Sequence, residues 1–173
     1  RWGLVPHWAR DLKIGSRMFN ARAETLAGSP AFRDSLARRR CIVPVDSFYE
    51  WKREGSTRQP YRIVRADDRP LALAGLWAAW KDPASGEVRR TFTIVTGPAN
   101  ELVGTLHDRM PIVLADSDWQ RWLDPAPADP GELAAILERP RDDLPLVAYP
   151  VATAVNDARR EGPALIERPA PAT

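Results

Sequence analysis

The carboxylate of Glu50 is the most conspicuous polar group in the sequence, because its surroundings are apolar and aromatic. It lies in SFYEWKREG, residues 47–55, at the end of a run that begins CIVPVD. In an extended strand its side chain points away from those of Tyr49 and Trp51. Two interpretations follow. If Trp51 belongs to the core, Glu50 is an ordinary surface carboxylate. If Glu50 faces a cleft, partial burial can tune its pKa for general acid–base catalysis.

Two further polar clusters contain residue types that suit chemistry on an oxygen-rich ligand. Residues 19–25, FNARAET, place Asn20, Arg22 and Glu24 on one side of the chain if the segment is extended. Such a face suits either ligand recognition or a solvated strand edge. In LHDRMP, His107 is one of two histidines in the chain. It lies at an expected helix–strand junction, where catalytic groups are often presented, although a single histidine can equally be structural.

The hydrophobic pattern predicts an α+β scaffold for these clusters. Strands are expected at residues 41–51, 60–66, 70–80, 90–96, 110–114 and 146–151, with turn signals such as REGST and DPASGE between them. Helices are expected at residues 98–107, 116–123, 130–138 and 29–40, the last with Ser29 as N-cap and Pro30 at its first position. We predict one domain, residues 1–173, with a curved, mostly antiparallel, barrel-like sheet, peripheral helices and a frayed tail at about residues 168–173.

Composition restricts the class of protein. A chain of 173 residues with 44% hydrophobic and 28% charged residues is typical of a globular protein with a substantial core. No segment has the apolar length that a membrane span requires. The single cysteine, Cys41, excludes an internal disulfide and a cysteine-rich zinc site. The net charge of +2 permits a polyanionic partner without requiring one, and arginine greatly outnumbers lysine, which suits phosphate or reflects a GC-rich genome.

Several motifs together resemble a known family. The chain contains, in this order, RWGLVPHWA, NARAET, FRDSLARRRCIVPVDSFYEWK, QPY, LAGLW, TFTIVT, HDRMP and YPVATAVN. This series resembles the SOS response-associated peptidase (SRAP) domain family over nearly the whole chain, from Arg1 to about Pro169. NARAET, FYEW and HDRMP are the most specific of these motifs.

The resemblance implies an activity and a partner. Members of the family bind single-stranded DNA, sense abasic sites and form a covalent DNA–protein crosslink that shields the lesion. Their nucleophile is a cysteine directly after the initiator methionine, exposed when that methionine is removed autoproteolytically. Its amine and thiol capture the ring-opened sugar aldehyde as a thiazolidine, without a metal or other cofactor. We accordingly expect a cytoplasmic, nucleoid-associated monomer whose catalytic residues are Asn20, Glu50 and His107.

The implied chemistry accounts for these three residue types. An α-amine has a pKa of roughly 7.7–8.0, so a nearby carboxylate such as Glu50 can take its proton before attack on the aldehyde. The imine that follows needs protons moved on and off, which suits His107. The amide of Asn20 can hold a sugar oxygen or orient the amine without adding charge.

A DNA-binding surface is expected beside these residues. Single strands are held by phosphate contacts and by stacking of bases on aromatic rings. The predicted DNA-binding residues are Trp8, Arg22, Arg33, Trp51, Thr96 and Arg109. The remaining tryptophans are assigned to packing: Trp2, Trp77, Trp80, Trp119 and Trp122.

One departure from the family pattern concerns the nucleophile. The N-terminal cysteine is not in this sequence, and we expect an upstream segment to supply it. Cys41 lies in the apolar run RRRCIVPVD and is expected to be a small buried hydrophobe. Two other functions remain open: a cysteine-type peptidase acting in trans, and a single-strand binding module without chemistry. The second would need the aromatic residues and arginines but neither Glu50 nor His107.

Overall fold

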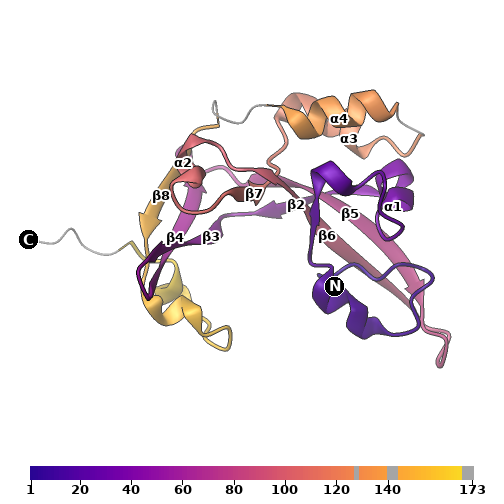
Figure 1. The fold of residues 1–173 in the computed structure, drawn as a ribbon, viewed down its shortest axis with the longest axis horizontal. Coiled ribbons are helices and arrows are strands. Elements are labelled where there is room, and N and C mark those ends of the chain that lie inside the picture. The colour runs from indigo at the N-terminus through magenta and orange to yellow at the C-terminus, as the bar shows by residue number, and fades with distance from the viewer. Residues whose placement is uncertain (127–128, 140–143, 169–173) are drawn as a thin grey trace, which may run out of the picture. The chain divides into compact units, whose positions relative to one another are not determined.

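A computed structural model describes residues 1–126, 129–139 and 144–168. Contacts along the chain group it into two compact units, which are described separately (Figure 1). Unit 1 consists of Arg1–Pro44, Ala72–Gly97 and Pro111–Arg139, and unit 2 of Val45–Leu71, Pro98–Met110 and Pro140–Thr173. None of the helices in the described ranges is long and apolar enough to cross a membrane.

Unit 1 is built on a sheet of five strands in the order β1-β6-β5-β2, with β7 also paired to β6. Strand β1 runs parallel to β6, whereas β5 and β6 form an antiparallel hairpin. The strands are β1 (Asn20–Arg22), β2 (Arg40–Val45), β5 (Leu71–Lys81), β6 (Val88–Pro98) and β7 (Arg109–Pro111). The two long strands carry the buried residues on which the rest of the unit packs.

Short helices cover this sheet. They are α1 (Arg33–Arg38), α3 (Trp119–Leu123), α4 (Pro130–Glu138) and the 3₁₀ helices Leu12–Arg17, Ala23–Thr25 and Asp116–Asp118. Trp122 of α3 and Leu133 of α4 join Leu76 and Val95 in one buried cluster, so α3 and α4 cover the sheet through their apolar sides (Figure 1). Burying such side chains contributes about 1.5–3 kcal/mol each, so this cluster is the main stabilising feature of the unit.

The buried guanidinium of Arg40 joins the ends of two helices in unit 1. Its Nη1 donates to the carbonyls of Leu36 and Ala37, each at 2.7 Å, at the end of α1. Its Nε donates to the carbonyl of Trp122 at 2.7 Å, and its Nη2 donates to that of Asp124, both at the end of α3. The last carbonyls of a helix have no partner within it, so a cation there satisfies them and complements the helix dipole.

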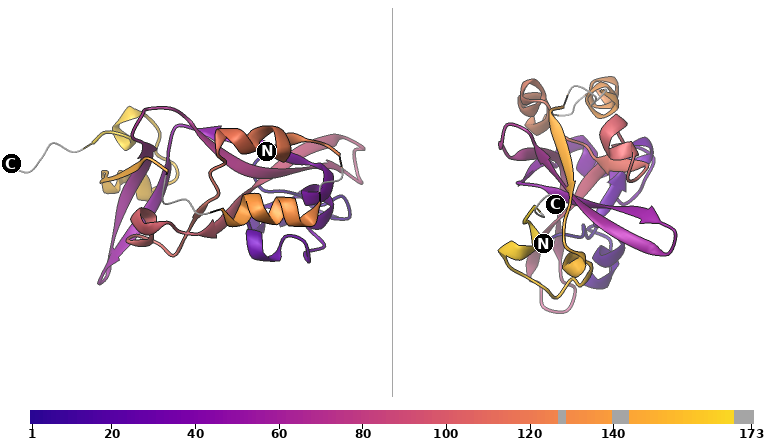
Figure 2. Two further views of the ribbon diagram at one scale, coloured as in Figure 1. Left: turned by 90° about the horizontal axis from the view of Figure 1, so that it is seen from above. Right: turned by 90° about the vertical axis from the view of Figure 1, so that its left-hand side faces the viewer.

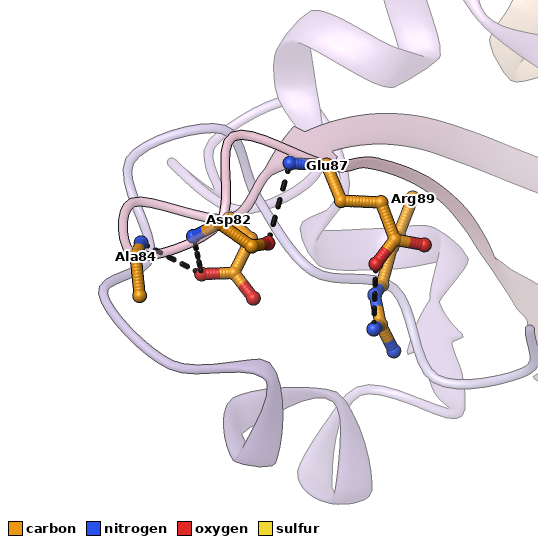
Figure 3. A network of polar contacts seen from close by, with 5 residues as sticks. Asp82, Ala84, Glu87 and Arg89 are labelled. Carbon is orange, nitrogen blue, oxygen red and sulfur yellow. Dashed lines mark hydrogen bonds and ion pairs between the residues drawn. The ribbon is translucent and has the colours of Figure 1, made fainter.

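The β5–β6 hairpin depends on a turn that is closed by its own polar groups (Figure 3). The N–H of Asp82 donates to the carbonyl of Glu87 at 2.8 Å. The Asp82 carboxylate accepts from the N–H of Ala84, also at 2.8 Å. Arg89 donates to the Glu87 carboxylate at 2.8 Å. This turn matches the DPASGE signal in the sequence and sets the register of the long hairpin.

A glycine in β5 allows close packing against β2. A Cβ at Gly75 would lie 2.9 Å from both the Cys41 Sγ and the Val43 Cγ2. No real side chain tolerates such contacts, so the glycine of the LAGLW motif is required by the approach of these two neighbours.

Unit 2 contains a three-stranded antiparallel sheet in the order β3-β4-β8. Its strands are β3 (Phe48–Glu54), β4 (Thr57–Arg65) and β8 (Leu146–Pro150), and its helices are α2 (Glu101–Gly104) and the 3₁₀ helices Thr153–Asn156 and Pro163–Leu165. Glu50 pairs with Tyr61, and Tyr61 pairs with Pro150, so these three side chains share one face. We call it the Glu50 face.

The opposite face of this sheet carries Tyr49, Arg62 and Tyr149, which pair directly across the strands. We call it the Tyr149 face. The C-terminal segment, drawn in yellow, lies against it (Figure 2): the Tyr49 hydroxyl donates to the carbonyl of Leu165 at 3.1 Å. Arg62 donates to the carbonyl of Ile166, also at 3.1 Å. The C-terminal segment is therefore bound to this face by polar contacts in addition to packing.

The predicted α+β class, with a mostly antiparallel sheet and peripheral helices, is confirmed. In the described ranges the strands divide between two sheets, neither of which closes into a barrel. The single strand expected at 41–51 is two strands, because the chain leaves one sheet after Val45 and enters the other at Phe48. The helix expected at 29–40 starts only at Arg33, after a turn at Pro30. Apart from Arg168, the expected frayed tail lies outside the described residues.

Candidate functional site

Glu50 lies in the middle of β3, where the strand alternation directs it away from its aromatic neighbours, as predicted. Its side chain is half-buried, and its strand partner on the Glu50 face is Tyr61. Neither simple interpretation from the sequence holds alone, because Trp51 is also only half-buried. Glu50 is thus a partly desolvated carboxyl that keeps access to solvent.

The electrostatic surroundings raise the pKa of Glu50 above its ordinary value of 4.5. Burial is the main cause, because it disfavours the charged form, and the Asp108 carboxylate adds to the effect. The His107 imidazole and the backbone N–H of Trp51 act in the opposite direction, since both favour the carboxylate. The structure therefore places Glu50 and His107 close enough for their charges to interact.

A closed loop carries His107 to this position. Asn100 begins α2, and its side chain accepts the N–H of Val103 at 2.9 Å. The N–H of His107 donates to the Val103 carbonyl at 2.9 Å, and the N–H of Ala99 donates to the Asp108 carbonyl at 3.0 Å. Val103 is fully buried, so the loop is anchored at its centre and fastened at both ends.

The backbone also orients the imidazole of His107. The N–H of Arg109 donates to its Nδ1 at 3.0 Å. The Arg109 carbonyl lies 3.3 Å from the same nitrogen, so whether Nδ1 accepts or donates depends on the tautomer. The Asp108 carboxylate lies 3.1 Å from the same Nδ1, but that side chain is 88% exposed and its influence is screened by water. All three contacts fall on Nδ1, so Nε2 is the ring nitrogen that is placed to exchange a proton with a ligand.

Asn20, Arg22 and Thr96 are brought together in unit 1. Asn20 and Arg22 are exposed on either side of buried Ala21, as the alternation predicts, and Arg22 pairs with Thr96 across the β1–β6 ladder. Thr96 is buried, and its hydroxyl lies 3.5 Å from the Ala21 carbonyl. Glu24 does not extend this face, because the strand ends at Arg22 and a 3₁₀ helix begins.

Three exposed aromatic rings lie in the N-terminal part of unit 1. Trp8, predicted to contact bases, is 49% exposed, and its indole N–H donates to the Pro30 carbonyl at 3.4 Å. Trp2, predicted to pack in the core, is instead 54% exposed and forms an edge-to-face pair with Phe19 at 6.0 Å. The packing assignment is therefore wrong for Trp2: its indole N–H donates to the Phe19 carbonyl at 2.7 Å, and its ring partner Phe19 is itself 48% exposed. Phe19, directly before Asn20, was not singled out from the sequence.

The other predicted contact residues occupy varied positions. Arg33 is exposed at the start of α1, with Nε 3.7 Å from the Asp34 carboxylate. Trp51 lies on the Tyr149 face, where its indole N–H donates to Asn156 at 2.6 Å. Arg109 is half-buried beside His107. The packing assignments are confirmed for Trp80 and Trp122, which are 2% and 0% exposed.

The ionisable side chains differ in the chemistry that they allow. In the ranges that the structure describes, no three His, Cys, Asp or Glu side chains gather as a metal site would require. Cys41 is partly buried, and burial raises the pKa of its thiol to about 11, which suppresses the reactive thiolate. Glu50 and His107 are thus the pair in unit 2 that can hold and release protons.

Comparisons with known proteins agree with the motifs. The family model of the SOS response associated peptidase (SRAP) matches residues 1–158. The chain is 46% identical over 168 residues to abasic site processing protein YoqW of Bacillus subtilis, covering 96% of this chain and 74% of the relative. It is 33% identical over 186 residues to abasic site processing protein HMCES of Gallus gallus, covering 94% of this chain and 54% of that protein.

Solved structures share the fold. A crystal structure of a protein from Bacteroides thetaiotaomicron matches with a TM-score of 0.88 and 32% identity, over 98% of this chain and 75% of that one. A protein from Bordetella bronchiseptica matches with a TM-score of 0.73 and 32% identity, over 88% and 75% of the two chains. The family model and these relatives together show that the chain belongs to the SOS response associated peptidase (SRAP) family.

Proposed function

We propose that this protein processes abasic sites in DNA and that Glu50 and His107 are its proton-transfer pair. The observation that carries the proposal is the half-buried carboxyl of Glu50, with its raised pKa, within electrostatic reach of an oriented imidazole. A raised pKa lets a carboxyl exchange protons closer to neutral pH than an exposed glutamate does. The names of the YoqW and HMCES relatives support abasic DNA as the substrate.

The reaction that we infer is capture of the abasic aldehyde by an N-terminal cysteine upstream of this sequence. The α-amine adds to the aldehyde carbon to give a carbinolamine, which loses water to form an imine. The thiol then adds across the C=N bond: sulfur bonds to carbon and the thiol proton goes to nitrogen. The product is a thiazolidine, and one water is released overall, so the sequence needs no oxidant or reductant.

Each of the two residues has a proton to move in this scheme. Glu50 takes a proton from the attacking ammonium and returns one to the departing hydroxyl. His107 donates from Nε2 to the sugar oxygen as the ring opens, because Nδ1 is occupied by the N–H of Arg109. Asn20 is exposed on β1, and we propose that its side-chain amide binds a sugar hydroxyl.

We also propose that the protein prefers single-stranded DNA. The exposed cations Arg22 and Arg33 and the exposed ring of Trp8 supply the phosphate and stacking contacts that a single strand uses. Affinity should fall as salt rises, because each phosphate contact releases counterions. Equal affinity for blunt duplex, or binding that ignores salt, would contradict this preference.

The decisive experiment separates proton transfer from binding with Glu50→Gln in the full-length protein. Gln keeps the size and hydrogen bonding of Glu but cannot carry the proton. With saturating abasic single-stranded DNA, the rate of covalent product should fall by about 10²–10⁴-fold. Affinity for a non-reactive abasic analogue should stay equal or rise slightly, since a negative charge near phosphates is removed.

Glu54→Gln is the matched control, because Glu54 is an exposed carboxylate on the same strand, paired with Lys52 at 2.9 Å. It should leave the rate unchanged. An unchanged rate with weakened binding for Glu50→Gln would make Glu50 a contact residue. A wild-type protein that cleaves unrelated peptides but forms no covalent product would be a peptidase. One that only binds DNA would be a binding module, and either result would refute the proposed function.

A further inference from the structure

A polar cavity lies in unit 2, and neither Glu50 nor His107 lines it. Its volume is about 450 Å³, and its lining includes Arg62, Arg168 and Tyr149. Arg62 and Tyr149 pair with each other across β4 and β8, on the Tyr149 face of the sheet. Glu50 belongs to the opposite face, so this cavity is separated from it by the thickness of the sheet.

The charge of the cavity is unbalanced. Four arginines line it, against the two carboxylates of Asp46 and Asp68. One of the four, Arg65, makes a two-pronged pair with Asp67 at 2.6 and 2.8 Å, and Asp67 is not part of the lining. The lining therefore has an excess of positive charge that a bound anion would neutralise.

Two of these guanidinium groups converge on one aromatic ring. The Cζ of Arg62 lies 6.0 Å and that of Arg168 lies 5.4 Å from the centre of the Tyr149 ring. Two cations that contact the same ring and line the same cavity repel each other, and an anion bound by both would offset that repulsion. The ring attracts both cations and so keeps them in place.

Neutral groups fix Arg62 in this position. Its Nε donates to the Ser47 hydroxyl at 2.9 Å, and its Nη1 donates to the Tyr149 hydroxyl at 2.7 Å and the Ile166 carbonyl at 3.1 Å. These partners orient the guanidinium without cancelling its charge. These contacts use the N–H of Nε and both N–H groups of Nη1, so Arg62 offers a ligand its positive charge and the N–H groups of Nη2, which suit a phosphate oxygen.

One part of the wall is apolar and suits a ring system. Val64 and Val147 pair directly across the strands and lie two residues from Arg62 and Tyr149, so they share the Tyr149 face. A cavity of this volume is in the range of small-molecule sites. We propose that it binds a nucleotide, with the phosphate between Arg62 and Arg168 and the sugar or base against the two valines. The ligand is either a free nucleotide or the terminal nucleotide of a phosphorylated DNA strand.

The test compares thymidine 5′-monophosphate with thymidine in calorimetric titrations of the full-length protein. The monophosphate should bind at least about 10-fold more tightly, since a charge-assisted contact to phosphate is lost in the nucleoside. Arg168→Gln should weaken its binding by about 10–100-fold. Arg168 is exposed, so this substitution should leave the fold intact, which Arg62→Gln, with three hydrogen bonds to lose, need not do.

Arg159→Gln is the matched control, because Arg159 is an exposed arginine of the same unit that pairs with Asp157 at 2.9 Å outside the cavity. It should leave binding unchanged. Competition by a 5′-phosphorylated, but not a 5′-hydroxyl, thymidine oligonucleotide would identify a DNA end as the ligand. Binding of the monophosphate without such competition would identify a free nucleotide. Equal binding of nucleoside and nucleotide, or equal losses in Arg168→Gln and Arg159→Gln, would overturn the proposal. The proposed crosslinking chemistry does not enter this test.

Discussion

Replacing Arg40 by Met should destabilise unit 1 more than any single surface change. Met retains most of the aliphatic length of Arg but donates no hydrogen bond, so the carbonyls at the ends of α1 and α3 lose their partner. The contact with the Trp122 carbonyl is buried and the other three are part-buried, so water can replace part of what is lost, and we count the net loss as two hydrogen bonds. Two lost charge-assisted hydrogen bonds at about 1.5–2.5 kcal/mol each give a loss of about 3–5 kcal/mol.

That loss is a net value, because burying a cation has its own cost. Burial lowers the pKa of Arg40, and the Asp124 carboxylate only partly offsets this effect. The free energy of unfolding should be measured in urea with tryptophan fluorescence, since Trp122 reports on the contact directly. In a chain of this size the Tm should fall by about 6–20 °C.

Arg38→Met is the control, because Arg38 is exposed on α1 and its substitution should cost less than about 1 kcal/mol. The loss of stability in Arg40→Lys should lie between those of Arg40→Met and Arg38→Met, since an ammonium keeps the charge but cannot reach both helix ends. If Arg40→Met costs no more than Arg38→Met, the buried guanidinium does not stabilise the helix ends and the reasoning fails.

Three further predictions concern single residues. At pH values above the raised pKa of Glu50, Glu50→Gln should increase the free energy of unfolding, because the folded protein disfavours the carboxylate. This gain should vanish below pH 4.5, where the carboxyl is protonated in the folded and the unfolded chain alike. Urea titrations at neutral and at acid pH would show the difference. Cys41, with a pKa of about 11 against an ordinary 9.0, should react with iodoacetamide about 100-fold more slowly than in the unfolded chain, and Cys41→Ser should leave crosslinking intact. Loss of the crosslink in folded Cys41→Ser protein would make Cys41 the nucleophile. Gly75→Ala should cost about 1–3 kcal/mol, whereas Gly28→Ala, with open space around it, should cost little, and equal losses would refute the close-packing argument.

The parts of the site that local periodicity encodes were predictable. Alternation in NARAET placed Asn20 and Arg22 together on the exposed side of a strand, and alternation in FYEW separated Glu50 from Trp51. Both follow from the two-residue repeat of an extended chain and need no knowledge of the fold. The α+β class was predictable for the same reason.

The features that the sequence did not indicate depend on contacts between distant segments. The indole of Trp51 is bound by Asn156, which is 105 residues away, and no local pattern indicates that partner. Trp2 pairs with the exposed ring of Phe19, 17 residues away, and no local pattern indicates that pairing. The break at Asp46 and Ser47 separates two runs that read as one strand, because a change of sheet leaves the hydrophobic pattern almost intact.

The alternation of side chains along β3 also restricts insertions and deletions in this strand. Adding one residue between Asp46 and Glu50 while keeping the pairing with β4 would turn the acid to the Tyr149 face and bring an aromatic ring beside His107. Deleting one residue would do the same. At the tip of the same hairpin, Gly55 has a φ of +61° and open space around it, so added residues there would change neither face. Length variation among related chains should therefore collect at the hairpin tip and be absent from the strand itself.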